Sequence, residues 1–309
     1  MSKAGKLAAV CAAVLVVGLA LGAAGYALGG VKGFDKVSEK HSWIGGTPGE
    51  RVVYAEGEPG FDAVEVTGNA SVYLVTEKYF KDQKWLDKNE LLSATETDIA
   101  GENQVVIIKG EKIPDPQISL EDGVLRIYAK EKKTNISFNF SSVDVTPKIL
   151  ICCPDKEYTD FSVNVDTGDI ILGGVSYKKA TLETDTGDVI AKEAKGDEQV
   201  IKSDTGDVIL SGTFGKTQIK VDTGDIKLSG TYDKGADINS DTGDVVLKAT
   251  AGIDAFDLDL RTDTGDIVIS ENGQKTIVLD DESPSFTRKG SGQLFKVDVD
   301  TGDILLSFN

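Results

Sequence analysis

The tetrapeptide Asp-Thr-Gly-Asp occurs seven times in the second half of this 309-residue chain. A fixed word at a fixed period is typical of one supersecondary unit stacked many times. The spacings between copies are 19, 19, 18, 19, 22 and 37 residues, so the last spacing is about two periods long. It predicts one coil that has lost its motif near residues 280–283 and gained a loop. The copies begin at Asp166, Asp185, Asp204, Asp222, Asp241, Asp263 and Asp300.

Apolar and polar residues alternate on both sides of every copy. The third residue before each first Asp is apolar and the next is polar, as in Val163 followed by Asn164. This period of two is the pattern of strands with one buried face. A strand pair this short cannot bury its apolar face alone, whereas coils stacked about 4.8 Å apart share a continuous interior. We therefore predict an all-β fold, a single β-solenoid over residues 161–309 with coils of about 18–19 residues and Asp-Thr-Gly-Asp turns.

Residues 61–160 show the same alternation without the Asp-Thr-Gly-Asp motif. This pattern predicts that they form the irregular first coils and the cap of the same solenoid domain. The turn at residues 66–70 resembles a degenerate copy of the motif, and residues 79–93 are expected to form a short helical insertion. The candidate strands are residues 63–66, 71–76, 104–109, 124–128, 135–140 and 148–152.

Residues 7–28 form an uncharged run of 22 residues, long enough as a helix to cross a hydrocarbon core of about 30 Å. The alternatives are an uncleaved anchor and a cleaved signal peptide. The anchor is favoured because signal peptides usually have a shorter apolar region of about 7–15 residues. We expect a tail at residues 1–6, a linker at 29–60, a cytoplasmic N-terminus and an extracytoplasmic solenoid. Lysines flank the run on both sides, so charge does not decide the orientation.

Composition excludes several classes of function. A net charge of −18 argues against nucleic acid as a partner and against unaided binding to anionic lipid or wall polymers. His41 is the only histidine, which removes most histidine-dependent catalysis and most transition-metal sites. Asp-Thr-Gly is also the active-site word of aspartic proteases, but seven copies at a coil period indicate a structural device. We expect a protein that is not an enzyme and has no cofactor other than calcium.

Calcium is the one metal that the motif suggests. Stacked coils place the aspartates in columns, where two carboxylates at ~5 Å repel by about 3 kcal/mol at an effective dielectric of 20. Splaying into water, hydrogen bonds from turn amides, or a bound cation would each relieve this repulsion, and calcium accepts carboxylate oxygens in flexible geometry. The candidate calcium ligands are Asp166, Asp169, Asp185, Asp188, Asp204, Asp207, Asp222, Asp225, Asp241 and Asp244.

Residues 60–309 resemble the bacterial family labelled putative adhesin domain, a β-strand-repeat family of unknown function. The likeness rests on the membrane segment, the Gly-Val-Leu-Arg-Ile-Tyr strand at residues 123–128, the apolar strand ending in Pro154, and the repeated Thr-Gly-Asp coils. The resemblance implies an adhesin-like domain, and some family members are associated with cell-envelope stress. The insertion at residues 79–93 and the break at 280–292 depart from the family pattern.

These observations predict a membrane-anchored extracytoplasmic β-solenoid that serves as a scaffold or adhesin-like surface of the bacterial cell envelope. Its expected partners are the membrane and an unidentified envelope protein or polysaccharide. The alternatives are a calcium-dependent binding module and a carbohydrate-active β-helix enzyme, which would need outward aromatic residues and a carboxylate pair. Self-association is a further possibility, because a last coil ending at residue 309 would be bare unless residues 283–293, with Phe286 and Arg288, fold over it.

Overall fold

The structure is a computed structural model that describes residues 51–54, 60–82, 105–108, 117–129, 148–280 and 282–308. The described residues belong to one compact unit, Arg51–Asn309. They are almost entirely β-strand, with one short helix, α3 (Glu77–Asp82), and one 3₁₀ turn, η1 (Ile253–Ala255). In this part of the chain no helix is long and apolar enough to cross a membrane, and the predicted anchor at residues 7–28 lies outside it.

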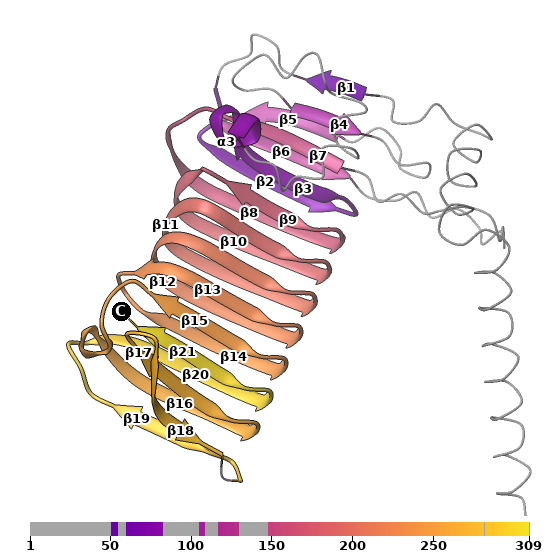
Figure 1. The fold of residues 1–309 in the computed structure, drawn as a ribbon. Helices are drawn as coiled ribbons and strands as arrows, with labels where there is room; N and C mark the ends of the chain where they lie inside the picture. Colours follow the sequence, from indigo (N-terminus) through magenta and orange to yellow (C-terminus); the bar gives the residue numbers. More distant parts are fainter. Residues whose placement is uncertain are drawn as a thin grey trace, which may run out of the picture. The chain divides into compact units, whose positions relative to one another are not determined.

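Each regular coil contributes one strand to each of two hydrogen-bonded ladders, joined by the motif turn (Figure 1). We call the ladder that leads into the turns the pre-turn face and the ladder that leaves them the post-turn face. In spatial order the pre-turn face contains β5 (Gln117–Glu121), β6 (Val124–Ala129), β2 (Ala63–Gly68), β8 (Glu157–Thr167), β10 (Ser176–Thr186), β11 (Val189–Thr205), β12 (Val208–Thr223), β14 (Ala236–Thr242), β20 (Gln293–Thr301), β16 (Phe256–Thr264) and β19 (Ser285–Arg288).

The post-turn face runs beside it. Strands β11 and β12 belong to both faces, because each continues through the second corner of its coil without a break. In spatial order this face contains β1 (Arg51–Tyr54), β4 (Val105–Ile108), β7 (Lys148–Cys153), β3 (Ser71–Thr76), β9 (Ile170–Gly173), β11, β12, β13 (Ile226–Tyr232), β15 (Val245–Ala249), β21 (Ile304–Phe308), β17 (Ile267–Glu271) and β18 (Gln274–Leu279).

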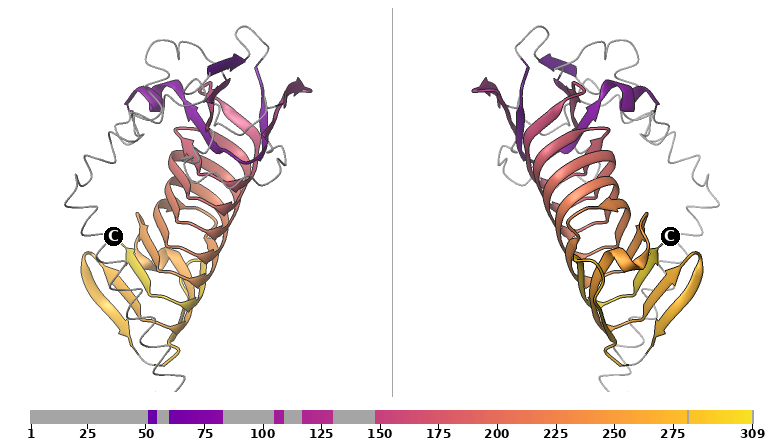
Figure 2. Two further views of the ribbon diagram at one scale, coloured as in Figure 1. Left: turned by 90° about the vertical axis from the view of Figure 1, so that its right-hand side faces the viewer. Right: turned by 90° about the vertical axis from the view of Figure 1, so that its left-hand side faces the viewer.

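The coils stack in parallel along one axis, as Figure 2 shows from two sides. Antiparallel strands occur only where the described stack begins and finishes. They are β5 and β4 at one end and β18 and β19 at the other; β1 pairs antiparallel with β4 and so runs in the direction of the coils. The predicted all-β, solenoid-like stack is therefore confirmed for the described residues, and both of its ends are capped by strands that run against the coils.

The spatial order of the coils differs from their order in the chain at both ends. The first coil, β2 and β3, lies between the coil of β6 and β7 and the coil of β8 and β9. The last coil, β20 and β21, lies between β14–β15 and β16–β17. The coils nearest each end of the described chain are thus held by neighbours on two sides.

This order corrects two predictions about the C-terminal region. Residues 280–283 do not belong to a coil that lost its motif, because β18 and β19 turn back as an antiparallel cap. Phe286 and Arg288 do cover an end of the stack, as predicted, but they pair with β16 and not with the last coil. The last coil is not bare, so the reason given for end-to-end self-association does not apply.

In the N-terminal region, five of the six candidate strands correspond to β2, β3, β4, β6 and β7 within two residues. The sixth, at residues 135–140, lies outside the described residues. Of the predicted insertion at residues 79–93, the described part ends at Asp82 and belongs to helix α3, which begins at Glu77.

The degenerate turn at residues 66–70 is present, but its register differs from the expected one. Val72 pairs with Ile170, so Ser71 occupies the level of a second motif Asp and Ala70 the level of a motif Gly. The hydroxyl Oγ of Ser71 accepts the backbone N–H of Asp169 at 3.1 Å. Serine therefore supplies the oxygen that aspartate supplies in the later coils.

Inward-facing aliphatic side chains fill the space between the two faces, and aromatic rings stack along the second corner. Phe161 lies between Tyr158 and Tyr177, with ring centroids 5.0 and 5.6 Å apart. Further along the stack, Phe295 contacts Tyr232 at 5.7 Å and Phe256 at 5.0 Å. Such pairs bury large areas and lock neighbouring coils together.

Candidate functional site

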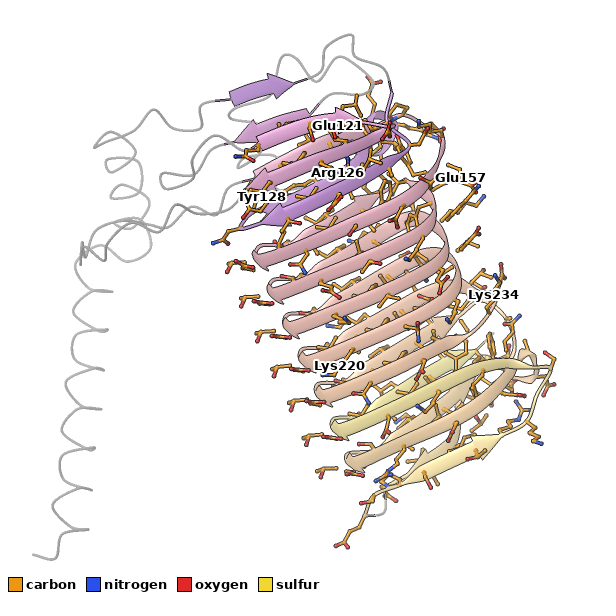
Figure 3. All side chains as sticks on the ribbon, turned by 180° about the vertical axis from the view of Figure 1, so that it is seen from behind. Glu121, Arg126, Tyr128, Glu157, Lys220 and Lys234 are labelled. Carbon is orange, nitrogen blue, oxygen red and sulfur yellow. The ribbon has the colours of Figure 1, made fainter. Side chains whose placement is uncertain are left out.

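The motif turns form a straight row along one edge of the stack, on the left in Figure 3. In six of the seven motif turns the Gly donates its backbone N–H to the motif Thr carbonyl of the next coil, for example Gly206 to Thr223 at 2.9 Å. The same bond joins Gly243 to Thr301 and Gly302 to Thr264, across coils that are distant in sequence. The turns thus continue the β-ladder around the corner.

Only glycine fits this turn. Gly224 has a φ of +148°, a conformation that side chains rarely allow. A Cβ atom added there would lie 2.1 Å from the carbonyl oxygen of Gly206 in the adjacent coil. The positive φ and the close approach of the adjacent backbone thus meet at one residue of the motif.

The second Asp of each motif forms a continuous hydrogen-bond ladder along the row. The Oδ1 atom of Asp207 accepts the backbone N–H of Asp225 at 2.9 Å, and the Oδ1 atom of Asp225 accepts that of Asp244 at 3.1 Å. The ladder continues through Asp303 to Asp266, following the spatial order of the coils and not their order in the chain. Hydrogen bonding to turn amides is therefore one of the predicted remedies for carboxylate repulsion that the molecule uses.

Lys227 adds a positive charge beside this ladder. Its ammonium lies 3.0 Å from Oδ2 of Asp225 and 3.5 Å from Oδ2 of Asp207. The hydrogen bond from the Asp244 amide, followed by that from Lys227, lowers the pKa of the Asp225 carboxyl. The same carboxylates raise the pKa of Lys227, mainly through its hydrogen bond to Asp225. Lys227 was not predicted from sequence as a functional residue, although it is the one charged residue at its position in the seven motif-bearing coils.

The first Asp of each motif has a different environment. Asp166, Asp185, Asp204, Asp241, Asp263 and Asp300 are exposed, and Asp222 is half-buried. Two of them have cationic neighbours two residues earlier: Lys220 lies 2.9 Å from Asp222, and Arg261 lies 2.7 Å from Asp263. These carboxylates face water and are not part of the amide ladder.

The ten candidate calcium ligands therefore fall into two rows. The second-Asp row comprises Asp169, Asp188, Asp207, Asp225 and Asp244, whose Oδ1 atoms already accept amides. The first-Asp row comprises Asp166, Asp185, Asp204, Asp222 and Asp241. Among the residues that the structure describes, no group of three or more Asp, Glu, Cys or His side chains is arranged to hold a metal ion. Calcium binding by these ten residues stays a prediction.

The pre-turn face presents polar side chains in rows that cross the strands. Asn164 donates to Glu183 at 3.0 Å, and Lys202 lies 2.6 Å from the same carboxylate. At one end of this face, Arg126 lies 3.1 Å from Glu65. Tyr128 stands beside them with 46% of its surface exposed, in the same row as Asn164. Figure 3 labels Arg126 and Tyr128 on this face.

Tyr128 was not proposed as a functional residue from sequence. The alternation of residues in strand β6 could have identified it. Leu125 and Ile127 face the core, so Arg126 and Tyr128 between and after them face outward. An exposed tyrosine on a flat polar sheet offers a ring face and a hydroxyl to a ligand.

The repeat-region aromatics Tyr177, Phe214, Tyr232, Phe256, Phe295 and Phe308 are buried, and Phe286 is half-buried. They therefore do not form the outward platform that the carbohydrate-enzyme alternative requires. Cys152 and Cys153 are buried free thiols, and burial raises the pKa of Cys153 well above its usual range. A buried thiol with a raised pKa is a poor nucleophile.

Comparison with protein-family models matches residues 88–307 to Toastrack DUF4097. No curated protein matches the chain. A "putative adhesin" from Bacteroides fragilis is similar to it, with 15% identity, a TM-score of 0.44, and coverage of 84% of this chain and 97% of the other. A "putative cell adhesion protein" from Clostridium sporogenes has 11% identity and a TM-score of 0.35, with 84% and 100% covered. A "putative lipid binding protein" from Parabacteroides distasonis has 16% identity and a TM-score of 0.42, with 86% and 98% covered.

Proposed function

This chain belongs to the Toastrack DUF4097 family, and from that premise we propose that it is a non-enzymatic, adhesin-like binding domain of the bacterial cell envelope. The ligand-binding surface is the pre-turn face, and the ligand is an envelope polysaccharide. The observation that carries the proposal is the flat row of Tyr128, Thr67 and Asn164, three outward residues on adjacent strands.

The chemistry of this row suits a sugar polymer. The Tyr128 ring can stack on the apolar face of a sugar, while the Thr67 hydroxyl and the Asn164 amide can bond its hydroxyl groups. Arg126 and Glu65 beside them pair at 3.1 Å, so together they add no net charge to this part of the face. The strand spacing of about 4.8 Å is close to the length of one sugar residue, so a chain lying across the strands meets one row position per strand.

The proposal includes a membrane anchor at residues 7–28, with the N-terminus in the cytoplasm and the solenoid outside. Support comes from the length of the uncharged run and from the family resemblance, which also implies a link to envelope stress. Fractionation of cells tests the anchor: the full-length mass should remain in the membrane fraction, and added protease should digest the solenoid of intact protoplasts. A shortened, released protein would contradict the anchor.

The binding proposal is tested by sedimenting the purified full chain with insoluble cell-wall sacculi. We expect the wild type to co-sediment and Tyr128→Ala to weaken binding about tenfold, the equivalent of one lost stacking contact of about 1.4 kcal/mol. Gln274→Ala is the matched control, since Gln274 is also exposed but lies in β18 on the post-turn face. Wild type that stays in solution, or equal binding by Tyr128→Ala and wild type, would refute the proposal.

A further inference from the structure

The post-turn face carries a row of outward aliphatic side chains. Eight residues pair in succession across its strands: Ile171, Ile190, Ile209, Lys227, Val246, Leu305, Val268 and Val278. From Ile190 onward the aliphatic members are half-buried, and Val278 is 51% exposed. Outward positions of a solvated sheet are normally polar, so this row marks an interaction surface.

Two further rows flank the aliphatic one. On the turn side lies the second-Asp row, continued by Asp303 and Asp266, two residues before the aliphatic row in every motif-bearing coil. On the other side lies a row of small and basic residues without any carboxylate, two residues after the aliphatic row in these coils and three residues before Val278 in the antiparallel strand β18. Its members are Gly173, Lys192, Ser211, Ser229, Lys248, Ser307, Ser270 and Lys275. Three of these eight residues are lysines, so we call this row the basic stripe, and the face carries an acidic, an aliphatic and a basic stripe in parallel.

The one charged member of the aliphatic row does not interrupt this order. Lys227 directs its ammonium to Asp207 and Asp225, at 3.5 and 3.0 Å. The ammonium group therefore lies beside the acidic stripe, while the methylene groups of the Lys227 side chain extend over the aliphatic row.

We propose that the post-turn face binds the same face of a second copy of this chain. The two copies are related by a 180° rotation about an axis parallel to the stack. This rotation reverses the direction of the strands in the second copy and keeps each coil at the same height along the stack. Aliphatic rows then meet, and the basic stripe of one copy lies on the acidic stripe of the other, with Lys248 opposite Asp244 of the same coil level. A two-fold axis along the strands would instead place like stripes together, which costs free energy.

The same face is already covered by the chain's own helix at one end. Tyr79 of α3 lies over Gly173 and Gly174, where an added Cβ would meet the tyrosine ring or its Cβ within 3 Å. Tyr73, in line with the aliphatic row, is 6% exposed there. Beyond the helix the row is uncovered by the described residues, so the contact between copies runs from Ile190 to Val278.

The size of this surface predicts a weak dimer. Seven positions spaced about 4.8 Å apart and three rows about 6.6 Å apart cover roughly 30 by 16 Å. Two such surfaces bury about 1,000 Å², the lower limit for a specific interface. Association should therefore depend on protein concentration. Because the axis is parallel to the stack, the stacks of the two copies point in the same direction.

Disulfide trapping of the full chain tests the geometry. In a Cys11→Ser background, Ile209→Cys, Val246→Cys and Leu305→Cys each place a thiol beside the proposed axis, opposite its own copy. We expect all three variants to give a cross-linked dimer under mild oxidation. Gln218→Cys, half-buried on the pre-turn face, is the matched control and should remain monomeric.

A charge reversal tests the stripes. Lys248→Glu should lower the dimer yield of Ile209→Cys about tenfold, because two symmetric attractions become repulsions. Lys220→Glu makes the same charge change on the pre-turn face and should leave the yield unchanged. Cross-linking at only one row position, equal cross-linking of Gln218→Cys, or equal effects of the two charge reversals would each overturn the proposal.

Discussion

The amide ladder along the turns can be tested by comparing the two aspartates of one motif. Asp225 and Asp222 belong to the same turn and are similarly exposed, with 40% and 42% of each side chain accessible. Asp225 accepts the Asp244 amide, whereas Asp222 contacts the Lys220 ammonium. Alanine substitution of either residue removes one carboxylate. In Asp225→Ala this carboxylate belongs to the amide ladder, and in Asp222→Ala it belongs to an exposed ion pair.

The expected magnitudes differ enough to measure. A hydrogen bond to a charged group contributes about 1.5–3 kcal/mol, and partial exposure of Asp225 places its value near the lower limit. Loss of the Lys227 contact adds at most about 0.5 kcal/mol, since exposed ion pairs are screened by water. Asp225→Ala should therefore lower the free energy of unfolding by about 2 kcal/mol. Asp222→Ala should lower it by about 0.5 kcal/mol or less.

The stability lost in Asp225→Ala should also depend on pH. The folded state lowers the pKa of Asp225, so its stabilisation is complete above the unfolded pKa of about 3.9. It is lost as the pH falls below that value and through the lower folded pKa. The stability difference between wild type and Asp225→Ala should therefore shrink as the pH falls below about 4.

Urea unfolding followed by circular dichroism measures the stabilities, and hydrogen exchange measures the site directly. In Asp225→Ala the Asp244 amide should exchange about tenfold or more faster, as expected for a loss above 1.4 kcal/mol. Equal stability of the Asp225→Ala and Asp222→Ala proteins, with unchanged exchange at Asp244, would refute the role given to the ladder.

Three further predictions concern the turn, the inserted coil and calcium. Gly224→Ala should destabilise the chain by at least about 3 kcal/mol, from backbone strain and the clash with Gly206. Gly273→Ala, at φ +76° with open space around it, should cost about 1 kcal/mol in the same urea assay. Phe295→Ala should lower the free energy of unfolding by about 3–5 kcal/mol, because the ring is fully buried between two coils. The neighbouring Leu294 is 47% exposed, so Leu294→Ala should change that free energy by less than about 0.5 kcal/mol. If the first-Asp row binds calcium, millimolar calcium should raise the melting temperature and Asp204→Asn should reduce the rise; no calorimetric heat would contradict calcium binding.

Much of each coil could be predicted from sequence, because the relevant forces act locally. Alternation around the motif identified the buried face of strands such as β8, β10 and β12, and glycine identified the turn. The positions of Ser71 and Ala70 could not be predicted by matching the word, because the neighbouring coil sets their register through the pairing of Val72 with Ile170.

The candidate site was predicted less completely. Sequence identified the aspartates and the option of amide bonding, but the separation into a bonded row and an exposed row needed the turn geometry. Tyr128 and Lys227 became informative only when pairing across strands placed them beside Asn164 and the aspartate ladder.

The sequence by itself determined the family, the all-β class and the shape of a single coil, since these depend on period, turn chemistry and burial within about twenty residues. It did not determine which coil lies next to which. Every motif turn offers the same amides and carbonyls, so Gly243 could bond to any other coil equally well. Only long-range packing decided the order: the Phe295 ring fits between Tyr232 and Phe256, and the antiparallel cap closes the coil beyond. A repeated word specifies the bond that joins coils, while the residues that differ between coils select the partner.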